Sequence, residues 1–213
     1  EPRPTKLVAN LPYNIAAAVL RRFLEADQPP RRMVVMVQLE VGDAIVARPG
    51  KMSLLSVATQ VYGETRMIMK VAPGAFKPPP NVQSAVVRID VADTPRVDVP
   101  VETFFKVVRA GFGNPRKQLR NSLSYGMHVR QDVIDGVMRD AGVDATLRPE
   151  RLSLDDWAAI TRAWLRRPIL FLVAPSRRSR HAALAWQLVL LLRIVQRFAV
   201  AWLAPQAACS ELT

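Results

Sequence analysis

The tetrapeptide Asn10-Leu11-Pro12-Tyr13 joins an amide, a proline and an aromatic ring directly after a short apolar run, Lys6-Leu7-Val8-Ala9. The amide oxygen of Asn10 and the backbone carbonyl of Pro12, which we expect no helix to use, can accept the hydrogens of an exocyclic amino group. The ring of Tyr13 offers a stacking face. Ligands of open α/β sheets bind at strand ends, so this pattern predicts a pocket for an unstacked base. A plain strand-to-helix turn, with Tyr13 in the core, is the alternative.

A proline-rich segment at residues 73–80 carries a second aromatic residue, Phe76. Pro78, Pro79 and Pro80 stiffen this segment because proline fixes φ. A stiff loop can hold a ring over a pocket without the entropic cost of ordering it on binding. Phe76 and Tyr13 are therefore predicted to sandwich one base. In the alternative interpretation Phe76 anchors the loop to the core, since apolar aromatic residues are usually buried.

A cluster of basic residues is the third candidate site, and we predict that it contacts phosphate. Its members are Arg109, Arg116, Lys117 and Arg120. A helix is predicted to begin at Asn114-Pro115, with Asn at the cap and Pro at the first helical position. That start would present free N–H groups to a phosphate and place Arg116 and Arg120 on one face. A solvated basic face is the alternative.

The hydrophobic pattern places these motifs on an α/β sheet that is followed by helices. Strands are predicted at residues 6–10, 32–39, 66–71 and 84–91, and helices at residues 14–26, 41–47 and 53–61, the last capped by Ser53. The last two strands would form a hairpin around the proline-rich segment. This order is typical of the second half of a doubly wound, Rossmann-like sheet, so the predicted fold class is α/β.

Composition changes at two points and predicts three regions. Residues 1–99 form a partial α/β domain, residues 100–167 a small all-helical domain, and residues 168–213 an apolar and basic tail. Helices of the second region are predicted at residues 103–112, 131–141 and 155–166, besides the one at Asn114. The stretch 182–204 in the tail is long enough to span a bilayer, but its arginines favour an interfacial helix or one docked on a partner.

Charge and cysteine usage restrict the class of partner. The formal net charge is +12, which suits a partner rich in phosphate or an anionic membrane surface. The single cysteine, Cys209, excludes an internal disulfide framework and favours a reducing compartment. His128 and His181 are too few and too distant to indicate a metal site.

Five segments in a fixed order carry a resemblance to a known family. They are Asn10-Leu11-Pro12-Tyr13-Asn14-Ile15, Val37-Gln38-Leu39-Glu40-Val41 with Arg48-Pro49-Gly50, Phe76-Lys77-Pro78-Pro79-Pro80-Asn81-Val82-Gln83-Ser84-Ala85-Val86, Arg116-Lys117-Gln118-Leu119-Arg120-Asn121-Ser122-Leu123 and Arg148-Pro149-Glu150-Arg151-Leu152-Ser153. The first is shared by many amino-methyltransferases. All five together resemble the ribosomal RNA adenine N6-dimethyltransferase family, over residues 6–165.

The resemblance implies methyl transfer from S-adenosylmethionine to N6 of two adjacent adenosines in a hairpin loop of small-subunit rRNA, within a pre-30S ribosomal particle. Asn10 and the Pro12 carbonyl would take the two amino hydrogens and direct the nitrogen lone pair at the donor methyl group, with Asn10 also contacting the cofactor. Tyr13 and Phe76 would clamp the ring, and the basic helical domain would hold rRNA phosphates. No metal and no stable protein partner are expected, and the expected location is cytoplasmic.

Two features depart from the family pattern. The Gly-rich loop and the acidic residues that hold the cofactor would precede Glu1, so we expect a truncated chain with an exposed apolar sheet edge. Residues 168–213 resemble nothing in the family. Three alternatives stay open: a non-catalytic rRNA-binding assembly factor, an adenine methyltransferase acting on DNA, which the helical domain disfavours, and a membrane-associated protein, which rests on residues 182–204 alone.

Overall fold

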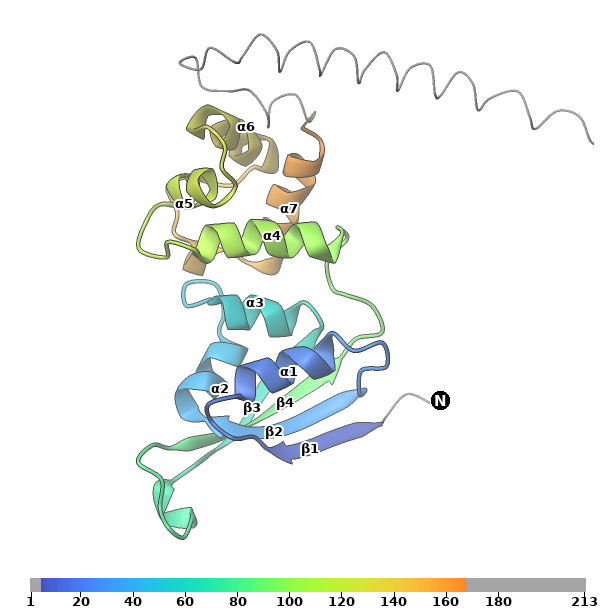
Figure 1. The fold of residues 1–213 in the computed structure, drawn as a ribbon, viewed down its shortest axis with the longest axis vertical. Coiled ribbons are helices and arrows are strands. Elements are labelled where there is room, and N and C mark those ends of the chain that lie inside the picture. The colour runs from blue at the N-terminus through green and yellow to red at the C-terminus, as the bar shows by residue number, and fades with distance from the viewer. Residues whose placement is uncertain (1–4, 168–213) are drawn as a thin grey trace, which may run out of the picture. The chain divides into compact units, whose positions relative to one another are not determined.

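The structure, a computed structural model, describes residues 5–167 (Figure 1). Within that range one mixed β-sheet is followed by a group of helices, as the alternation of hydrophobic residues predicts. The predicted tail at 168–213, with its apolar stretch at 182–204, lies outside the described residues.

The sheet has four strands in the order β1-β2-β4-β3. Their bounds are β1 Lys6–Asn10, β2 Arg32–Gln38, β3 Gly63–Val71 and β4 Ser84–Val91. β1 and β2 are parallel, whereas β4 runs antiparallel to both β2 and β3. The predicted hairpin of β3 and β4 is confirmed, and β4 is inserted between β2 and β3, which places its first residue near the carboxyl end of β1.

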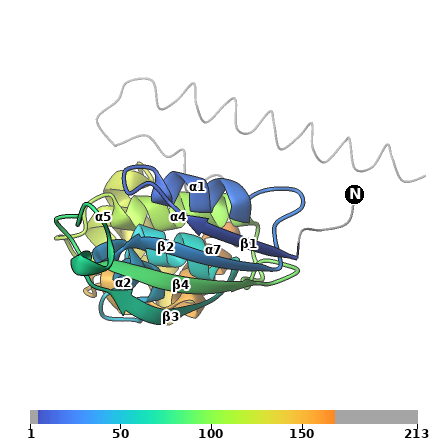
Figure 2. The same ribbon diagram turned by 90° about the horizontal axis from the view of Figure 1, so that it is seen from below.

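Three helices, α1 Ala16–Leu24, α2 Leu39–Val46 and α3 Leu54–Gln60, lie over one face of the sheet (Figures 1 and 2). Residues of β2 alternate between buried and half-buried, and its buried residues Met33 and Val35 pack in one core with Leu20 of α1. Figure 2 shows the other face, which the described helices leave uncovered. On that side Val8 of the edge strand β1 is 76% exposed.

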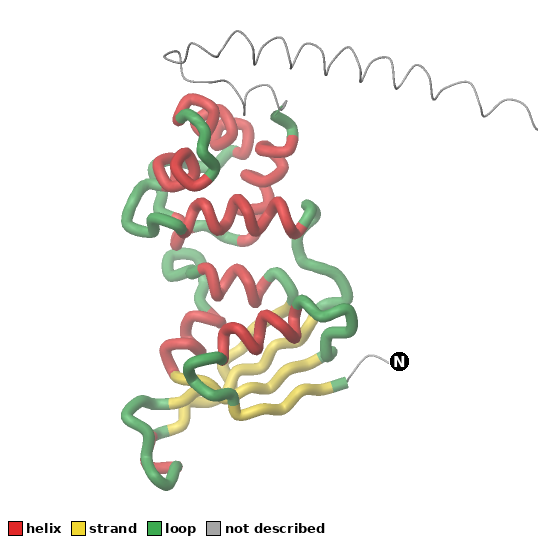
Figure 3. Tube along the Cα trace, viewed as in Figure 1, coloured by secondary structure: helices red, strands yellow, loops and turns green. Residues whose placement is uncertain are grey.

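The helical group consists of α4 Val101–Phe112, α5 Leu119–Gly126, α6 Gln131–Ala141 and α7 Leu154–Leu165 (Figure 3). These helices pack around Trp157, which is fully buried. The centroids of the Trp157 and Phe112 rings are 5.6 Å apart. The same core includes Val57 of α3 and the adjoining Val61. The change in composition near Pro100 therefore marks a change in secondary structure, while the helical core is completed by residues from the α/β part.

Local capping signals predict one helix start correctly and another wrongly. The Ser53 side chain accepts the N–H of Ser56 and caps α3, as predicted. The predicted helix start at Asn114-Pro115 is wrong, because residues 113–118 form turns and α5 begins at Leu119. Arg116 therefore lies in a turn and does not share a helix face with Arg120.

Hydrogen bonds within the turn, and one to a distant loop, account for this shifted start. The Asn114 carbonyl accepts the N–H of Lys117 at 2.9 Å and the hydroxyl of Ser122 at 2.9 Å, which stabilises the turn. The first amide groups of α5 are also used, since the N–H of Leu119 donates to the carbonyl of Leu147 at 2.8 Å. A distant loop thus replaces the local cap that the sequence pattern indicates.

We predict that Gly111→Ala destabilises the chain. A Cβ at Gly111 would overlap the indole ring of Trp157 and lie 3.3 Å from Cδ1 of Leu119. Overpacking of this kind costs about 1–3 kcal/mol of unfolding free energy, which urea denaturation measures. Gly74→Ala is the matched control, because a Cβ there meets nothing within 4 Å. Equal stability of the two variants would contradict the assigned packing.

Candidate base-binding site

A cavity of about 330 Å³ lies at the carboxyl end of β1. It is lined by Asn10, Leu11, Pro12, Tyr13, Phe76, Pro78 and Pro80. The structure therefore brings together the tetrapeptide and the proline-rich loop, which are far apart in the sequence. The volume lies near the lower end of the range, roughly 300–1,000 Å³, that is usual for small-molecule sites.

Strand register explains why these two segments meet. Asn10 is opposite Met36 in the β1–β2 pair, and Ser84 is opposite Gln38 in the β2–β4 pair. The end of β1 and the start of β4 consequently lie at the same end of the sheet, on either side of β2. The N–H of Leu11 donates to the Met36 carbonyl at 3.0 Å, so the chain stays paired with β2 as it leaves β1.

Tyr13 is held by a hydrogen bond across the sheet end. Its hydroxyl lies 2.7 Å from the Oγ of Ser84, which is fully buried at the start of β4. The ring is half-buried and lines the cavity. Because the polar end of the ring is tied to β4, the stacking face is oriented before any ligand binds. Ser84 was not predicted as a site residue, although it belongs to the Phe76–Val86 segment that carries the resemblance.

Asn10 ends β1 and is exposed at the cavity. Within residues 5–167, no hydrogen bond engages its side-chain amide. The amide oxygen can therefore accept a hydrogen from a ligand amino group.

The Pro12 carbonyl is used by a turn and not by a helix, as expected. It accepts the N–H of Ile15 at 3.2 Å, in the turn that precedes α1 at Ala16. A carbonyl oxygen has two lone pairs, and one remains available to a ligand. The turn arises because the chain must reverse direction between β1 and α1 within a few residues.

Phe76 is half-buried, and it belongs to neither hydrophobic core of the described residues. It directly follows a short 3-10 turn, Pro73–Ala75, and its N–H donates to the Pro73 carbonyl at 3.1 Å. The ring lines the cavity together with Tyr13. The structure thus favours a ring held at the cavity over a ring that anchors the loop in the core.

The cavity lining is electrically neutral, with no carboxylate, imidazole or thiol. Within residues 5–167, no group of three or more His, Cys, Asp or Glu side chains is placed to hold a metal ion. Asp90, a carboxylate with a shifted pKa, does not line this cavity. Burial alone would raise its pKa, but hydrogen bonds from Arg88 and Arg32 outweigh burial, so the pKa of Asp90 is lowered. Orientation by neutral groups is the chemistry that this lining can provide.

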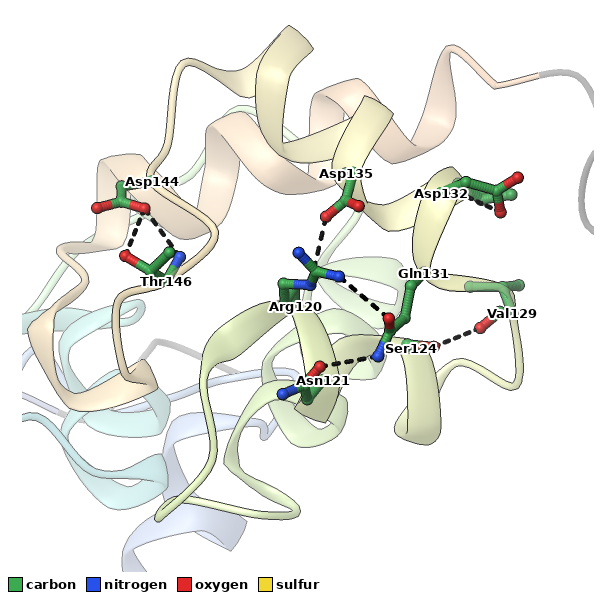
Figure 4. Close-up of polar contacts among 10 residues, drawn as sticks. Arg120, Asn121, Ser124, Val129, Gln131, Asp132, Asp135, Asp144 and Thr146 are labelled. Atoms are coloured by element: carbon green, nitrogen blue, oxygen red, sulfur yellow. Dashed lines mark hydrogen bonds and ion pairs between the residues drawn. The ribbon is translucent and has the colours of Figure 1, made fainter.

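The predicted basic cluster divides into exposed residues and one structural residue. Arg109, Arg116 and Lys117 are exposed. Arg120 is only partly exposed; its Nε lies 3.6 Å from Asp135 and another guanidinium N–H donates to Gln131 at 3.1 Å (Figure 4). Arg120 thus joins α5 to α6.

The neighbourhood of Arg120 reinforces this structural role. Gln131 also donates to the side-chain oxygen of Asn121 at 2.9 Å, so α5 and α6 are linked at two consecutive residues of α5 (Figure 4). The N–H of Arg120 itself donates to the Ala145 carbonyl at 3.1 Å. We expected the start of this helix to offer free N–H groups to a phosphate. The N–H groups of Leu119 and Arg120, the first two residues of α5, are already used, so the expectation is wrong for them.

Comparisons with known proteins identify the family. The family model described as "Ribosomal RNA adenine dimethylase" matches residues 2–166. The chain is 48% identical over 155 residues to ribosomal RNA small subunit methyltransferase A of Dehalococcoides mccartyi strain CBDB1, covering 72% of this chain and 53% of that protein. It is 43% identical over 159 residues to the protein of the same name from Desulfitobacterium hafniense strain DCB-2, covering 74% and 57%. The chain thus spans about half the length of these curated relatives.

Two solved structures share the fold. The 23S rRNA methyltransferase ErmE matches with a TM-score of 0.60 at 24% identity, covering 76% of this chain and 66% of that one. A dimethyladenosine transferase from Plasmodium falciparum matches with a TM-score of 0.66 at 17% identity, covering 75% and 66%. These two likenesses establish a shared arrangement of sheet and helices.

We predict that the Tyr13–Ser84 hydrogen bond contributes a measurable coupling energy. In a double-mutant cycle of Tyr13→Phe and Ser84→Ala, the unfolding free energies should be non-additive by about 0.5–1.5 kcal/mol, the usual net value of such a bond. Urea denaturation of the four proteins measures this term. Additive effects would mean that the two hydroxyls do not interact in solution.

Proposed function

This chain belongs to the ribosomal RNA adenine dimethylase family, and we propose that it forms the base-binding and RNA-binding part of an rRNA adenine N6,N6-dimethyltransferase. Its substrates are two adjacent adenosines of small-subunit rRNA, in a pre-30S particle in the cytoplasm, and S-adenosylmethionine is the methyl donor. The observation that carries this proposal is the cavity that joins Asn10, Tyr13 and Phe76 at the end of β1.

The adenine ring stacks between Tyr13 and Phe76. Aromatic stacking contributes roughly 1–3 kcal/mol per base and tolerates an extruded nucleotide. The hydrogen bond from Tyr13 to Ser84 supports this role, because a ring that is already oriented loses little freedom when the base binds.

The amino group of the adenine donates its two hydrogens to the Asn10 amide oxygen and to the free lone pair of the Pro12 carbonyl. Both acceptors lie at the same cavity, and together they hold the nitrogen so that its lone pair faces the donor methyl group. Alignment of reacting atoms is a large catalytic contribution in group transfer. A neutral lining suits this mechanism, because the residues orient the amine and no carboxylate competes for its hydrogens.

S-adenosylmethionine, when bound, supplies a methyl group on a sulfonium that is already cationic, so the leaving group needs no protonation. Asn10 is the residue that we assign to contact the donor, since it is exposed where β1 ends. Within residues 5–167 no Gly-rich loop follows a parallel strand, and we assign no other donor contact.

The helical group contacts the rRNA backbone through Arg109, Arg116 and Lys117. Their exposure supports this assignment, as does the net charge of +12, because counterion release drives binding to phosphate. Within residues 5–167, no helix has the length and apolar character to span a bilayer. We assign Arg120 to the link between α5 and α6 and not to the RNA.

We predict that Asn10→Ala lowers methyl transfer by at least about 100-fold, because the amine loses an acceptor that aligns it. Binding of small-subunit rRNA should change by less than about threefold, since phosphate contacts dominate the affinity. The measurement is transfer of labelled methyl from S-adenosylmethionine to rRNA, with the protein as its gene encodes it.

Asn14→Ala is the matched control, because Asn14 is also exposed but does not line the cavity. It should transfer methyl groups at the parental rate. Equal loss of transfer and binding in Asn10→Ala would defeat the orienting role. A parental protein that binds rRNA without transfer would indicate a non-catalytic assembly factor, and a preference for DNA would indicate an adenine methyltransferase acting on DNA.

We predict that Arg116→Ala with Lys117→Ala weakens rRNA binding and reduces the slope of log affinity against log salt by about 2. The stability of this double variant should change by less than about 0.5 kcal/mol, because both side chains are exposed. Arg120→Ala should show the reverse: a loss of about 0.5–1.5 kcal/mol of unfolding free energy with an unchanged salt slope. Salt titration and urea denaturation decide this, and the opposite pattern would return Arg120 to the interface.

A further inference from the structure

A second groove, of about 460 Å³, lies between α4 and the end of α5. It shares no lining residue with the cavity at Asn10. Lys106 and Arg109 of α4 line one side, and Tyr125 and Met127 line the other. Of these four residues, the sequence singles out Arg109 alone, as a member of the basic cluster.

Tyr125 gives this groove an aromatic surface that the fold does not use. Tyr125 is 74% exposed, more than any other aromatic residue in the described part of the chain. Its nearest ring is that of His128, at 6.5 Å between centroids. A ring so exposed contributes little to folding, so its free face is available to stack on a ligand.

The position of Tyr125 beside α4 is fixed by its neighbour. A Cβ at Gly126 would lie 2.6 Å from Cα and 2.7 Å from Cβ of Ala110. The end of α5 therefore packs with its backbone directly on α4, and only glycine permits that distance. Tyr125 is consequently held next to the basic face of α4 by rigid backbone.

The charges of the groove are positive and weakly paired. Lys106 and Arg109 are three residues apart and project from the same side of α4. Lys106 pairs at 2.9 Å with Glu102, but both side chains are well exposed, and such pairs are worth little. Within residues 5–167, Arg109 forms no salt bridge and lies 5.8 Å above the Phe105 ring. No carboxylate lines the groove.

We propose that this groove is a second nucleotide site, which holds one unpaired nucleotide of the rRNA away from the methylated adenosine. The base stacks on Tyr125, and the adjoining phosphate lies between Lys106 and Arg109. A free aromatic face beside two cations matches a ligand that carries a flat ring and a negative charge together. This inference rests on the proposed function, because it takes RNA as the substrate.

The test compares two RNAs and two variants of one residue. One probe is the small-subunit rRNA hairpin with its unpaired loop, and the other is a fully paired RNA duplex of equal length. Tyr125→Ala should lower the affinity for the hairpin about tenfold, as loss of one stacked base does. Its affinity for the duplex and its salt slope should stay unchanged, because the duplex offers phosphates but no unstacked base. Tyr125→Phe keeps the ring and should bind both RNAs like the parental protein.

Loss of either cation of the groove should change the salt dependence of binding. Lys106→Ala and Arg109→Ala should each reduce the salt slope by about 1 for the hairpin, because each removes a phosphate contact. Thermal unfolding of Tyr125→Ala should match the parental protein, since the side chain is exposed. An unchanged hairpin affinity in Tyr125→Ala, or an equal loss on both RNAs, would overturn the second site.

Failure of this inference is distinguishable from failure of the proposed function. If the parental protein methylates the rRNA but Tyr125→Ala binds the hairpin normally, only the second site is refuted. If the parental protein neither binds the hairpin nor transfers methyl groups, both are refuted. A tenfold loss in Tyr125→Ala together with normal transfer by Asn10→Ala would support the groove and refute the catalytic cavity.

Discussion

The insertion of β4 between β2 and β3 is the constraint on which the candidate site depends. Because β4 is antiparallel to β2, its first residue lies at the end of the sheet where β1 finishes. The hydroxyls of Tyr13 and Ser84 meet there, and the loop before β4 carries Phe76 to the same cavity. A parallel β4 would start at the opposite end, and the two rings would not share a cavity.

In the proposed function, the cavity and the helical group recognise the RNA by different physical interactions. The neutral, small cavity would select a base through stacking and through the directions of hydrogen-bond acceptors. The helical group would contribute affinity through charge, which does not depend on the base sequence. A base could then be oriented without competition from strong charges, while the remainder of the RNA is held at a distance from the reacting atoms.

In the proposed function, the helical group is both a scaffold and a binding surface. Its core is completed by Val57 and Val61 from the α/β part, so the two parts are packed together and not merely linked by a flexible segment. The Arg120 network and the backbone contact at Gly126 fix α5 against α6 and α4. Rigid packing of this kind is what allows exposed residues such as Tyr125 and Arg109 to keep a defined spacing.

Periodicity and local capping sufficed to predict the strands, most helices and the Ser53 cap, because those signals act between residues close in sequence. The tetrapeptide and Phe76 could also be identified as candidates from residue type. Sequence could not reveal the turn at Asn114, the structural use of Arg120, the Ser84 partner of Tyr13 or the exposure of Tyr125. These features depend on tertiary packing. Packing decides whether a group distant in the chain binds a residue in place of a local partner, or whether the residue stays exposed to solvent.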